Sequence, residues 1–207
     1  LDSIDSKGNT FGWLDPIKGY NFRNSYKNNS FSYNGPLLKS GFNTVQGFYA
    51  GAGFRYFEQI NKDGKWWNAG VNAEYGFSDK RLRPTFFFIK KWDNFSRTRL
   101  NISGGVTTSQ FNSREPMLKL GNTLRSLFFG DNYMKIYENT FSKVAYSQEI
   151  KNGVYFSSSL EYAKRTPLFN TTSYSFVKES KNEYTSNNPL EITDFTNGAF
   201  KEHNIAI

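Results

Sequence analysis

The stretch Trp66–Phe77 alternates, from Trp67 onward, between apolar residues and residues that are polar or lack a side chain. Successive side chains of a strand point to opposite faces, so the stretch is predicted to form a strand with one apolar and one polar face. It has 12 residues, whereas strands of soluble domains average about five or six. A tilted strand needs about 9–11 residues to cross a bilayer. The pattern therefore favours a transmembrane β-strand.

Other stretches of the chain repeat this alternation with variations. Long strands are predicted over residues 44–58, 82–92, 97–109, 139–150 and 153–165, and shorter ones near residues 20–26 and 31–33. Tight links join the long strands, and the pair Asn152-Gly153 supplies the positive φ angles of a two-residue hairpin. The predicted fold class is all-β: an antiparallel transmembrane β-barrel of the outer membrane, present in part, with one short loop helix.

Alternation gives each long strand a side expected to face lipid and a side expected to face the lumen, which is polar in such barrels. The residues predicted to face lipid are Trp67, Ala69, Val71, Ala73, Tyr75, Phe77, Phe48, Phe54, Leu100, Ile102, Val154, Phe156 and Leu160. The residues predicted to face the lumen are Asn68, Asn72, Glu74, Arg55, Asn101, Ser103 and Glu161. An arginine at Val71 should then cost about 2–4 kcal/mol, and one at Asn72 little.

Two long insertions, residues 110–138 and 166–203, are predicted to be surface loops on the same side of the sheet. The first contains apolar residues at helical spacing, with Pro116 suited to a first turn and Gly130 to a C-cap. The helix is expected to pack its apolar stripe on the barrel rim. The second insertion is polar, and we expect it to be solvated and to accept a tag near Asn187.

The composition agrees with a barrel better than with a soluble core. Aromatic residues make up 18% of the chain although the mean hydropathy is −0.65, which fits aromatic girdles around a polar interior. The net charge is +8, but the basic residues are scattered over turns and strand ends, Arg83 among them. We interpret them as interfacial cations facing phosphate headgroups, and we expect no nucleic-acid partner. The expected partners are outer-membrane lipid and lipopolysaccharide, and candidate partners are other outer-membrane or lipoprotein subunits.

Residues for catalysis or metal binding are scarce. The chain has no Cys, which excludes disulfides and thiolate chemistry, and His203 is its single histidine. The segment Gly51-Ala52-Gly53 lacks a third glycine and a following helix, so it is read as close strand packing or lumen clearance. Four carboxylates are interpreted as solvated: Asp131, Glu138, Glu179 and Glu183. No catalytic, cofactor-binding or metal-ligating residue and no cofactor is therefore assigned.

Three segments carry a resemblance to a known family: Asn43–Phe48, Leu127–Glu138 and Tyr162–Thr172. They resemble a Bacteroidota family of outer-membrane barrels of unassigned function, whose members typically place a carboxypeptidase-regulatory-like domain ahead of the barrel. The resemblance implies that residues 1–207 are a single segment of a larger barrel, and it implies no peptidase chemistry. Val45–Phe48 also resembles the VRGF loop motif of the outer-membrane assembly and two-partner secretion superfamily, although it lacks the Arg and is expected to run straight into a strand.

The leading hypothesis is an integral protein of the cell outer membrane with a non-enzymatic role in transport, envelope assembly or a larger surface complex. The alternative is a secreted soluble β-sandwich that binds polysaccharide through exposed aromatic side chains. A sandwich needs a buried aliphatic core between two sheets. The predicted apolar faces consist mainly of Phe, Tyr, Ala and Gly, so the sequence favours the first hypothesis.

Overall fold

The computed structural model describes residues 3–177, 184–188 and 202–206. Its elements are α1 (Ser3–Gly8), α2 (Asp15–Lys18), β1 (Tyr20–Asn24), β2 (Asn29–Asn34), η1 (Pro36–Lys39), β3 (Gly41–Asn43), β4 (Gly47–Gln59), β5 (Trp66–Gly76), β6 (Arg81–Lys91), β7 (Arg99–Gln110), α3 (Lys119–Phe129), β8 (Ile136–Lys151), β9 (Val154–Pro167) and β10 (Glu202–Ala206), where η1 is a 3₁₀-helix.

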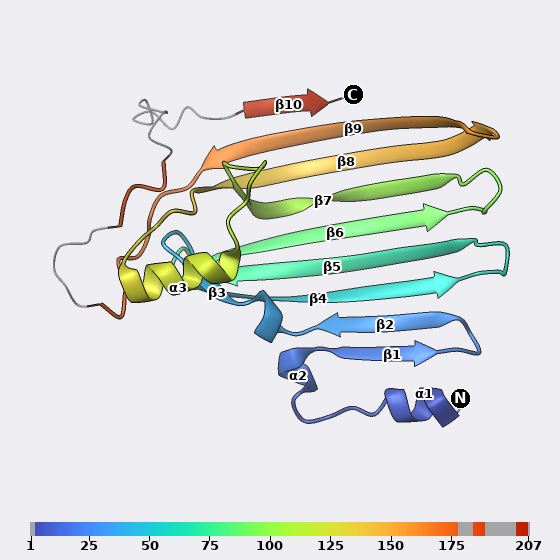
Figure 1. The fold of residues 1–207 in the computed structure, drawn as a ribbon, viewed down its shortest axis with the longest axis horizontal. Helices are drawn as coiled ribbons and strands as arrows, with labels where there is room; N and C mark the ends of the chain where they lie inside the picture. The colour runs from blue at the N-terminus through green and yellow to red at the C-terminus, as the bar shows by residue number, and fades with distance from the viewer. Residues whose placement is uncertain (1–2, 178–183, 189–201, 207) are drawn as a thin grey trace.

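The strands form one ten-stranded antiparallel sheet (Figure 1). Its order is β1-β2-β4-β5-β6-β7-β8-β9-β10, and β3 pairs with the beginning of β4. Every strand from β4 to β9 has between 11 and 16 residues. The predicted all-β antiparallel meander is confirmed. The sheet is open, since β1 and β10 lie at its two edges and do not pair with each other.

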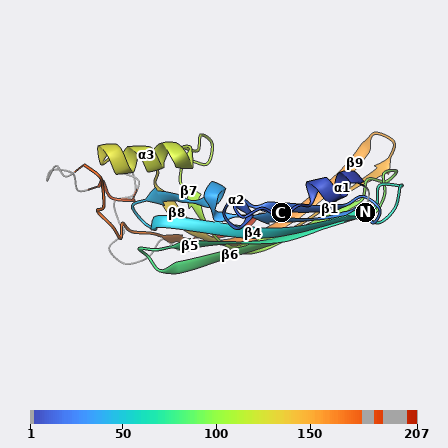
Figure 2. The same ribbon diagram turned by 90° about the horizontal axis from the view of Figure 1, so that it is seen from below.

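Cross-strand pairing defines two faces, because directly opposed residues of a sheet lie on the same side. Phe54, Val71 and Phe86 are consecutive partners across β4, β5 and β6, and we call their side the apolar face. Asn72 and Thr85 are partners on the opposite side, which we call the polar face. Figure 2 shows the sheet edge-on as a single layer, with α3 on one side of it.

The connections are unequal at the two ends of the sheet (Figure 1). Short links join β4 to β5, β6 to β7 and β8 to β9 at one end, which we call the hairpin end. The insertion that contains α3 and the segment after β9 lie at the opposite end, which we call the loop end. The predicted placement of both insertions on one side of the sheet agrees with this arrangement.

Buried apolar side chains gather at the loop end. One cluster joins Val45, Met134, Ile136 and Leu168, and a second joins Phe42, Leu127 and Tyr184. These residues come from β3, α3, β8 and the loop segments between the strands. Among the described residues, the central parts of the long strands therefore have no apolar core of their own.

The predicted loop helix is confirmed as α3, and its C-cap Gly130 has a φ of 70°, as expected. The prediction that Pro116 lies in the first turn was wrong, because the helix begins at Lys119. Its apolar stripe packs only in part: Leu127 is buried, whereas Leu120, Leu124 and Phe128 are exposed. The short helices α1, α2 and η1 were not expected from periodicity, since each has only four to six residues. No helix within the described ranges is long and apolar enough to cross a membrane.

Two expectations about the segments around the strands were wrong. The strand predicted over residues 44–58 begins at Gly47, because Thr44–Gln46 form a turn between β3 and β4. The insertion predicted to be solvated over residues 166–203 is partly buried where it is described, since Leu168, Tyr184 and Asn187 are at most 8% exposed. Glu179 and Glu183 lie outside the described residues.

Candidate functional site

The apolar face exposes a broad band of large hydrophobic side chains. The residues of this band, each 37–61% exposed, are Phe31, Phe48, Phe54, Val71, Tyr75, Phe77, Leu82, Phe86, Val144, Val154, Phe156, Leu160 and Tyr162. They extend over β2, β4, β5, β6, β8 and β9. Aromatic rings contact one another across the strands, with 5.0 Å between the ring centroids of Tyr56 and Trp67. The helix α3 lies over the opposite face, so no described helix covers this band.

The pairing places all 13 side chains predicted to face lipid on the apolar face, with Phe77 just beyond the end of β5. The Tyr75 and Phe77 rings lie 5.3 Å apart between centroids. The seven side chains predicted to face the lumen share the polar face. What surrounds either face stays a prediction.

The polar-face residues divide into separate groups. Asn72 and Glu74 lie together near the loop end and line a pocket. Asn68 and Asn101 flank Ile89 of β6, and the side-chain oxygen of each is buried without a described hydrogen-bond partner. Arg55 lies with its guanidinium carbon 5.6 Å from the centre of the Phe87 ring. Glu161 is further away on β9, where its carboxylate accepts from Lys143 Nζ at 2.8 Å.

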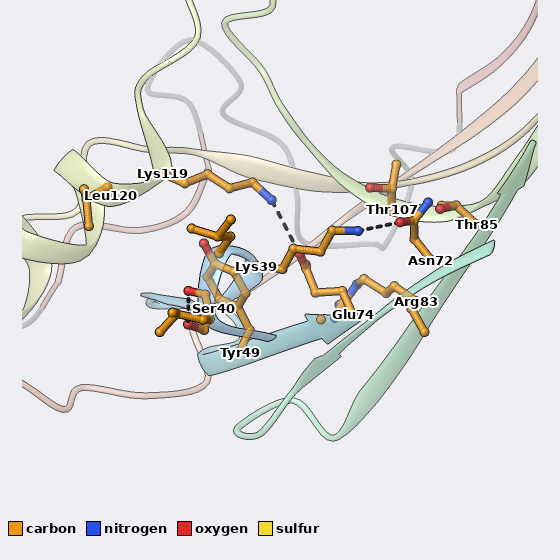
Figure 3. A pocket seen from close by; sticks show the side chains of 14 residues that line it. Lys39, Ser40, Tyr49, Asn72, Glu74, Arg83, Thr85, Thr107, Lys119 and Leu120 are labelled. Carbon is orange, nitrogen blue, oxygen red and sulfur yellow. Dashed lines mark hydrogen bonds and ion pairs between the residues drawn. The ribbon is translucent and has the colours of Figure 1, made fainter. Parts of the chain in front are cut away.

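The pocket on the polar face has a volume of about 440 Å³. Strands β4, β5 and β6 form its floor, β7 contributes Thr107, and η1 and the first turn of α3 form its opposite wall. In Figure 3, Lys39 extends from η1 toward Asn72, and Lys119 points from α3 toward Glu74. The lining includes three cations, Lys39, Lys119 and Arg83, but one carboxylate, that of Glu74.

The Glu74 carboxylate is shared between two donors. It accepts from Gln46 Nε2 at 2.8 Å and forms a longer ion pair with Lys119 Nζ at 3.4 Å. Lys39 Nζ donates to the amide oxygen Oδ1 of Asn72, and no described carboxylate forms an ion pair with it. Burial lowers the pKa of Lys39; Glu74 opposes this effect, and the charges of Arg55 and Lys119 add to it.

Glycines on β4 make room for the Lys39 side chain. A Cβ atom at Gly53 would lie 2.2 Å from Asn72 Oδ1 and 3.0 Å from Lys39 Nζ. A Cβ atom at Gly51 would lie 3.0 Å from the backbone oxygen of Ala73 and 3.5 Å from Lys39 Cβ. The glycines of Gly51-Ala52-Gly53 were predicted to give close strand packing or space in the lumen. The structure gives a specific reason for this space, because the Lys39 side chain lies over these residues.

Arg83 is the most deeply buried charge of the site, with its side chain 1% exposed. Its Nη2 atom contacts Asp79 Oδ2 at 2.5 Å and Glu138 Oε2 at 3.2 Å, and Arg81 also pairs with Glu138 at 3.1 Å. The Nε and Nη1 atoms of Arg83 are buried and have no described hydrogen-bond partner. The interpretations of Arg83 as an interfacial cation and of Glu138 as a solvated carboxylate were both wrong.

The turn Asn43–Gln46 links the pocket to the loop end. Asn43 Oδ1 accepts from the backbone amides of Val45 and Gln46, at 3.0 and 2.7 Å. Thr44 donates to Asn170 Oδ1 at 2.6 Å, and Ile136 packs with Val45. The three segments that carried the family resemblance therefore meet in space. The segment Val45–Phe48 runs directly into β4, as expected: Val45 and Gln46 form part of a buried turn, and Gly47 and Phe48 are the first residues of the strand.

The lysine and arginine residues of the pocket could not be recognised individually in the sequence. Lys39 comes from η1 and Lys119 from α3, which are 80 positions apart in the chain and meet only in the folded protein. The position of Arg83 could have been predicted from the sequence in one respect. If the strands pair across the short turn after Gly76, Arg83 lies opposite Glu74 on the polar face. No group of three or more His, Cys, Asp or Glu side chains that could hold a metal ion occurs in the described part of the chain.

One family model matches residues 14–207; its description reads "Family of unknown function (DUF5686) C-terminal domain". The match covers nearly the whole chain, including every strand of the sheet and both walls of the pocket. No curated protein and no solved structure shows a significant match.

Proposed function

We propose that this chain, which belongs to the family of unknown function DUF5686 as its C-terminal domain, is an integral β-barrel segment of the outer membrane. Its role is non-enzymatic, in transport, envelope assembly or a larger surface complex. The apolar face contacts lipid and the polar face lines the lumen. The resemblance to Bacteroidota barrels that follow a carboxypeptidase-regulatory-like domain supports the same proposal.

The exposed apolar face carries this proposal. Large apolar patches on soluble monomers rarely exceed a few hundred Å², because exposed apolar surface is unfavourable in water. The chain exposes 13,834 Å² of surface, whereas a compact monomer of 23.9 kDa would expose roughly 9,900 Å². An open single-layer sheet leaves both of its faces accessible, and its apolar face contributes the hydrophobic part of this exposed surface. A bilayer removes that face from water without a second protein layer.

Two further features support a barrel wall over the soluble sandwich. Strands of 11 to 16 residues reach or exceed the roughly 9–11 residues that a tilted transmembrane strand needs. The described strands form one sheet, whereas a sandwich requires two sheets about 10 Å apart with their apolar faces together. Closure of the sheet into a barrel, through further strands or further subunits, is part of the proposal.

Site-directed spin labelling tests the proposal, because the native chain has no Cys and a single introduced cysteine is unique. Val71→Cys places the label in the middle of β5 on the apolar face, and Ser159→Cys places it in β9 on the polar face. In lipid vesicles, the label at position 71 should be relaxed mainly by oxygen, which concentrates in the bilayer. The label at position 159 should be relaxed mainly by a water-soluble nickel complex.

Two controls make the outcome decisive. Lys62→Cys, in the exposed link between β4 and β5, reports a position outside the bilayer and should favour the nickel complex. A label at Phe54→Cys, the cross-strand partner of Val71, should behave like the label at position 71. Equal accessibility to the nickel complex at positions 71 and 159 would reject the membrane assignment.

A further inference from the structure

The pocket of the polar face has the features of a binding site for an anion. Three cations and one carboxylate line it. Arg83 is ion-paired with Asp79 and Glu138, and Lys119 with Glu74, so Lys39 is the lining cation with no described ion pair. Positive charge in a partly enclosed cavity attracts an anionic ligand more strongly than the same charge in open water, because solvent screens it less. The pocket, at about 440 Å³, falls within the usual range of roughly 300–1,000 Å³ for small-molecule sites.

Lys39 is the cation best placed to bind a ligand. Its ammonium group is half-buried over Gly51 and Gly53, and it is held by the neutral amide of Asn72. An ammonium group has three donors, so it can bind an incoming oxygen without leaving Asn72. A desolvated cation without a charged partner is costly, and an anion would offset that cost.

Arg83 supplies an independent indication of a ligand. Its side chain is 1% exposed, and two of its three nitrogen atoms have no described hydrogen-bond partner. Buried polar groups are normally satisfied, and an unsatisfied donor costs about 1–3 kcal/mol. Because Arg83 lines the pocket from the strand side, an anion or an ordered water that enters deeply could complete its hydrogen bonding.

The first turn of α3 adds further donors. Its N-cap is Leu118, which provides no side-chain cap, and the first turn has no acidic residue. The first amides of a helix lack intrahelical partners and carry a partial positive charge. Lys119 and Leu120 of this turn line the pocket wall, so the helix end favours negative charge beside the lysine.

From these observations we propose that the pocket between η1, α3 and the sheet binds a small solute through a carboxylate or phosphate group. Lys39 and Lys119 contact the anionic group, and Arg83 offers its unpaired Nε and Nη1 donors from the floor. Thr85 and Thr107 offer hydroxyl groups to the solute. The proposal does not depend on the membrane assignment, because the pocket is formed by the fold itself.

Calorimetric titration of the full chain in a neutral detergent tests the proposal with three probes: inorganic phosphate, glucuronate and glucose. Phosphate or glucuronate should bind, and uncharged glucose should not. Lys39→Gln should weaken the binding of the anion about tenfold, which corresponds to one lost charge-assisted hydrogen bond. Lys62→Gln is the matched control at the hairpin end and should leave the Kd unchanged.

Lys119→Gln is a second variant that is expected to fold normally, because this side chain is 54% exposed and should tolerate replacement. It keeps the test valid if Lys39→Gln does not fold. It should weaken anion binding while the circular dichroism spectrum stays that of the wild type. Binding of phosphate alone would assign the site to phosphate esters, and binding of glucuronate alone would assign it to carboxylates. The proposal is overturned if neither anion binds, or if both lysine variants bind the anion as tightly as the wild type does.

Discussion

At the scale of single residues, Gly105 marks the place where β6 and β7 separate. The pairing of these strands ends at Thr85 and Gly105, although β7 continues to pair with β8 beyond that point. Gly105 has a φ of 131°, and a Cβ atom there would lie 2.2 Å from the backbone oxygen of Pro84. Both the conformation and the space require glycine. The separation leaves room for Arg83, whose guanidinium contacts Glu138 of β8.

Gly105→Ala should therefore lower the free energy of unfolding by roughly 1–3 kcal/mol, the usual cost of a strained backbone conformation. Urea titration of the protein in lipid vesicles measures the change. Gly121→Ala is the control, because the nearest atom to its Cβ would be Leu118 Cβ at 3.9 Å and the site lies within α3. That change should raise the stability by about 0.5–1 kcal/mol. Equal effects of the two substitutions would contradict this explanation of Gly105.

The stability change caused by a substitution at Val71 shows whether the apolar face contacts lipid. Val71 is 54% exposed in the isolated sheet, so an arginine there creates no clash in water. In a bilayer, Val71→Arg should lower the free energy of unfolding by about 2–4 kcal/mol, because a cation near the midplane is poorly solvated. Ser159→Arg, on the polar face close to Glu161, should cost less than 1 kcal/mol, about the value for an exposed substitution.

The sequence suggested Asn72 as the polar-face control for Val71→Arg, but the structure makes it unsuitable. Its side chain accepts a hydrogen bond from Lys39, and an arginine there would place two cations side by side. Unfolding of both variants from the same vesicles provides the measurement. Similar losses at positions 71 and 159 would mean that both faces meet the same medium.

At the scale of elements, the link between β6 and β7 has its own electrostatic support. Asp93 accepts from the hydroxyl group and the backbone amide of Ser96, and these hydrogen bonds lower the pKa of Asp93 below its ordinary value of 3.8. A lowered pKa in the folded state means that the stabilisation is present above the ordinary value. It is lost as the pH falls from that value through the lowered one.

Asp93→Asn should therefore be less stable than the wild type at about pH 6, and the two proteins should converge at about pH 2. The free energy of unfolding of both proteins, measured at the two pH values, gives this difference. Asp63→Asn, in the exposed link between β4 and β5, is the control for the loss of a carboxylate at the same end of the sheet. A stability difference at position 93 that is the same at both pH values would rule out the carboxylate as its source.

The elements differ in how far the sequence could predict them. Strands such as β5 were predictable because alternation over about ten residues leaves few other conformations, whereas β6 was predicted from the apolar run Phe86–Ile89 between two turns. The bounds of β8 were less predictable: Ile136–Glu138 continue the strand, although they follow a loop and precede the alternating stretch. The turn Asn43–Gln46 was missed although the alternation of β4 changes phase there: its even positions are apolar from Phe48 onward, whereas Gln46 is polar and Val45 is apolar. Its stability comes from distant partners, such as Asn170, that periodicity does not show.

At the scale of the whole molecule, the two faces and the sidedness of the loops followed from the sequence, whereas the pocket did not. A face is a local property of each strand, and tight turns transmit it from one strand to the next. The pocket needs η1, α3 and the sheet to come together, and those contacts depend on packing at the loop end. The partial closure of the polar face by Lys39 and Lys119 is a result of that packing.

The sidedness gives the last prediction, which concerns the orientation of the protein in the outer membrane. Long loops of outer-membrane barrels lie outside the cell and short turns lie in the periplasm. An epitope inserted after Arg114, in the exposed part of the insertion before α3, should be tolerated and should be labelled on intact cells. Asn187 is not a suitable position, because its buried amide group donates to the backbone oxygens of Ile136 and Leu168, each at 2.6 Å.

The same epitope inserted between Asn152 and Gly153 should behave differently. This two-residue turn joins β8 to β9, and Gly153 has a φ of 79°, so an insertion disturbs the register of both strands. It should prevent assembly, or the epitope should be reached by antibody only after the outer membrane is opened. Immunofluorescence before and after permeabilisation compares the two insertions. Labelling of intact cells at position 152, with none at position 114, would require the opposite orientation, in which the pocket opens toward the periplasm.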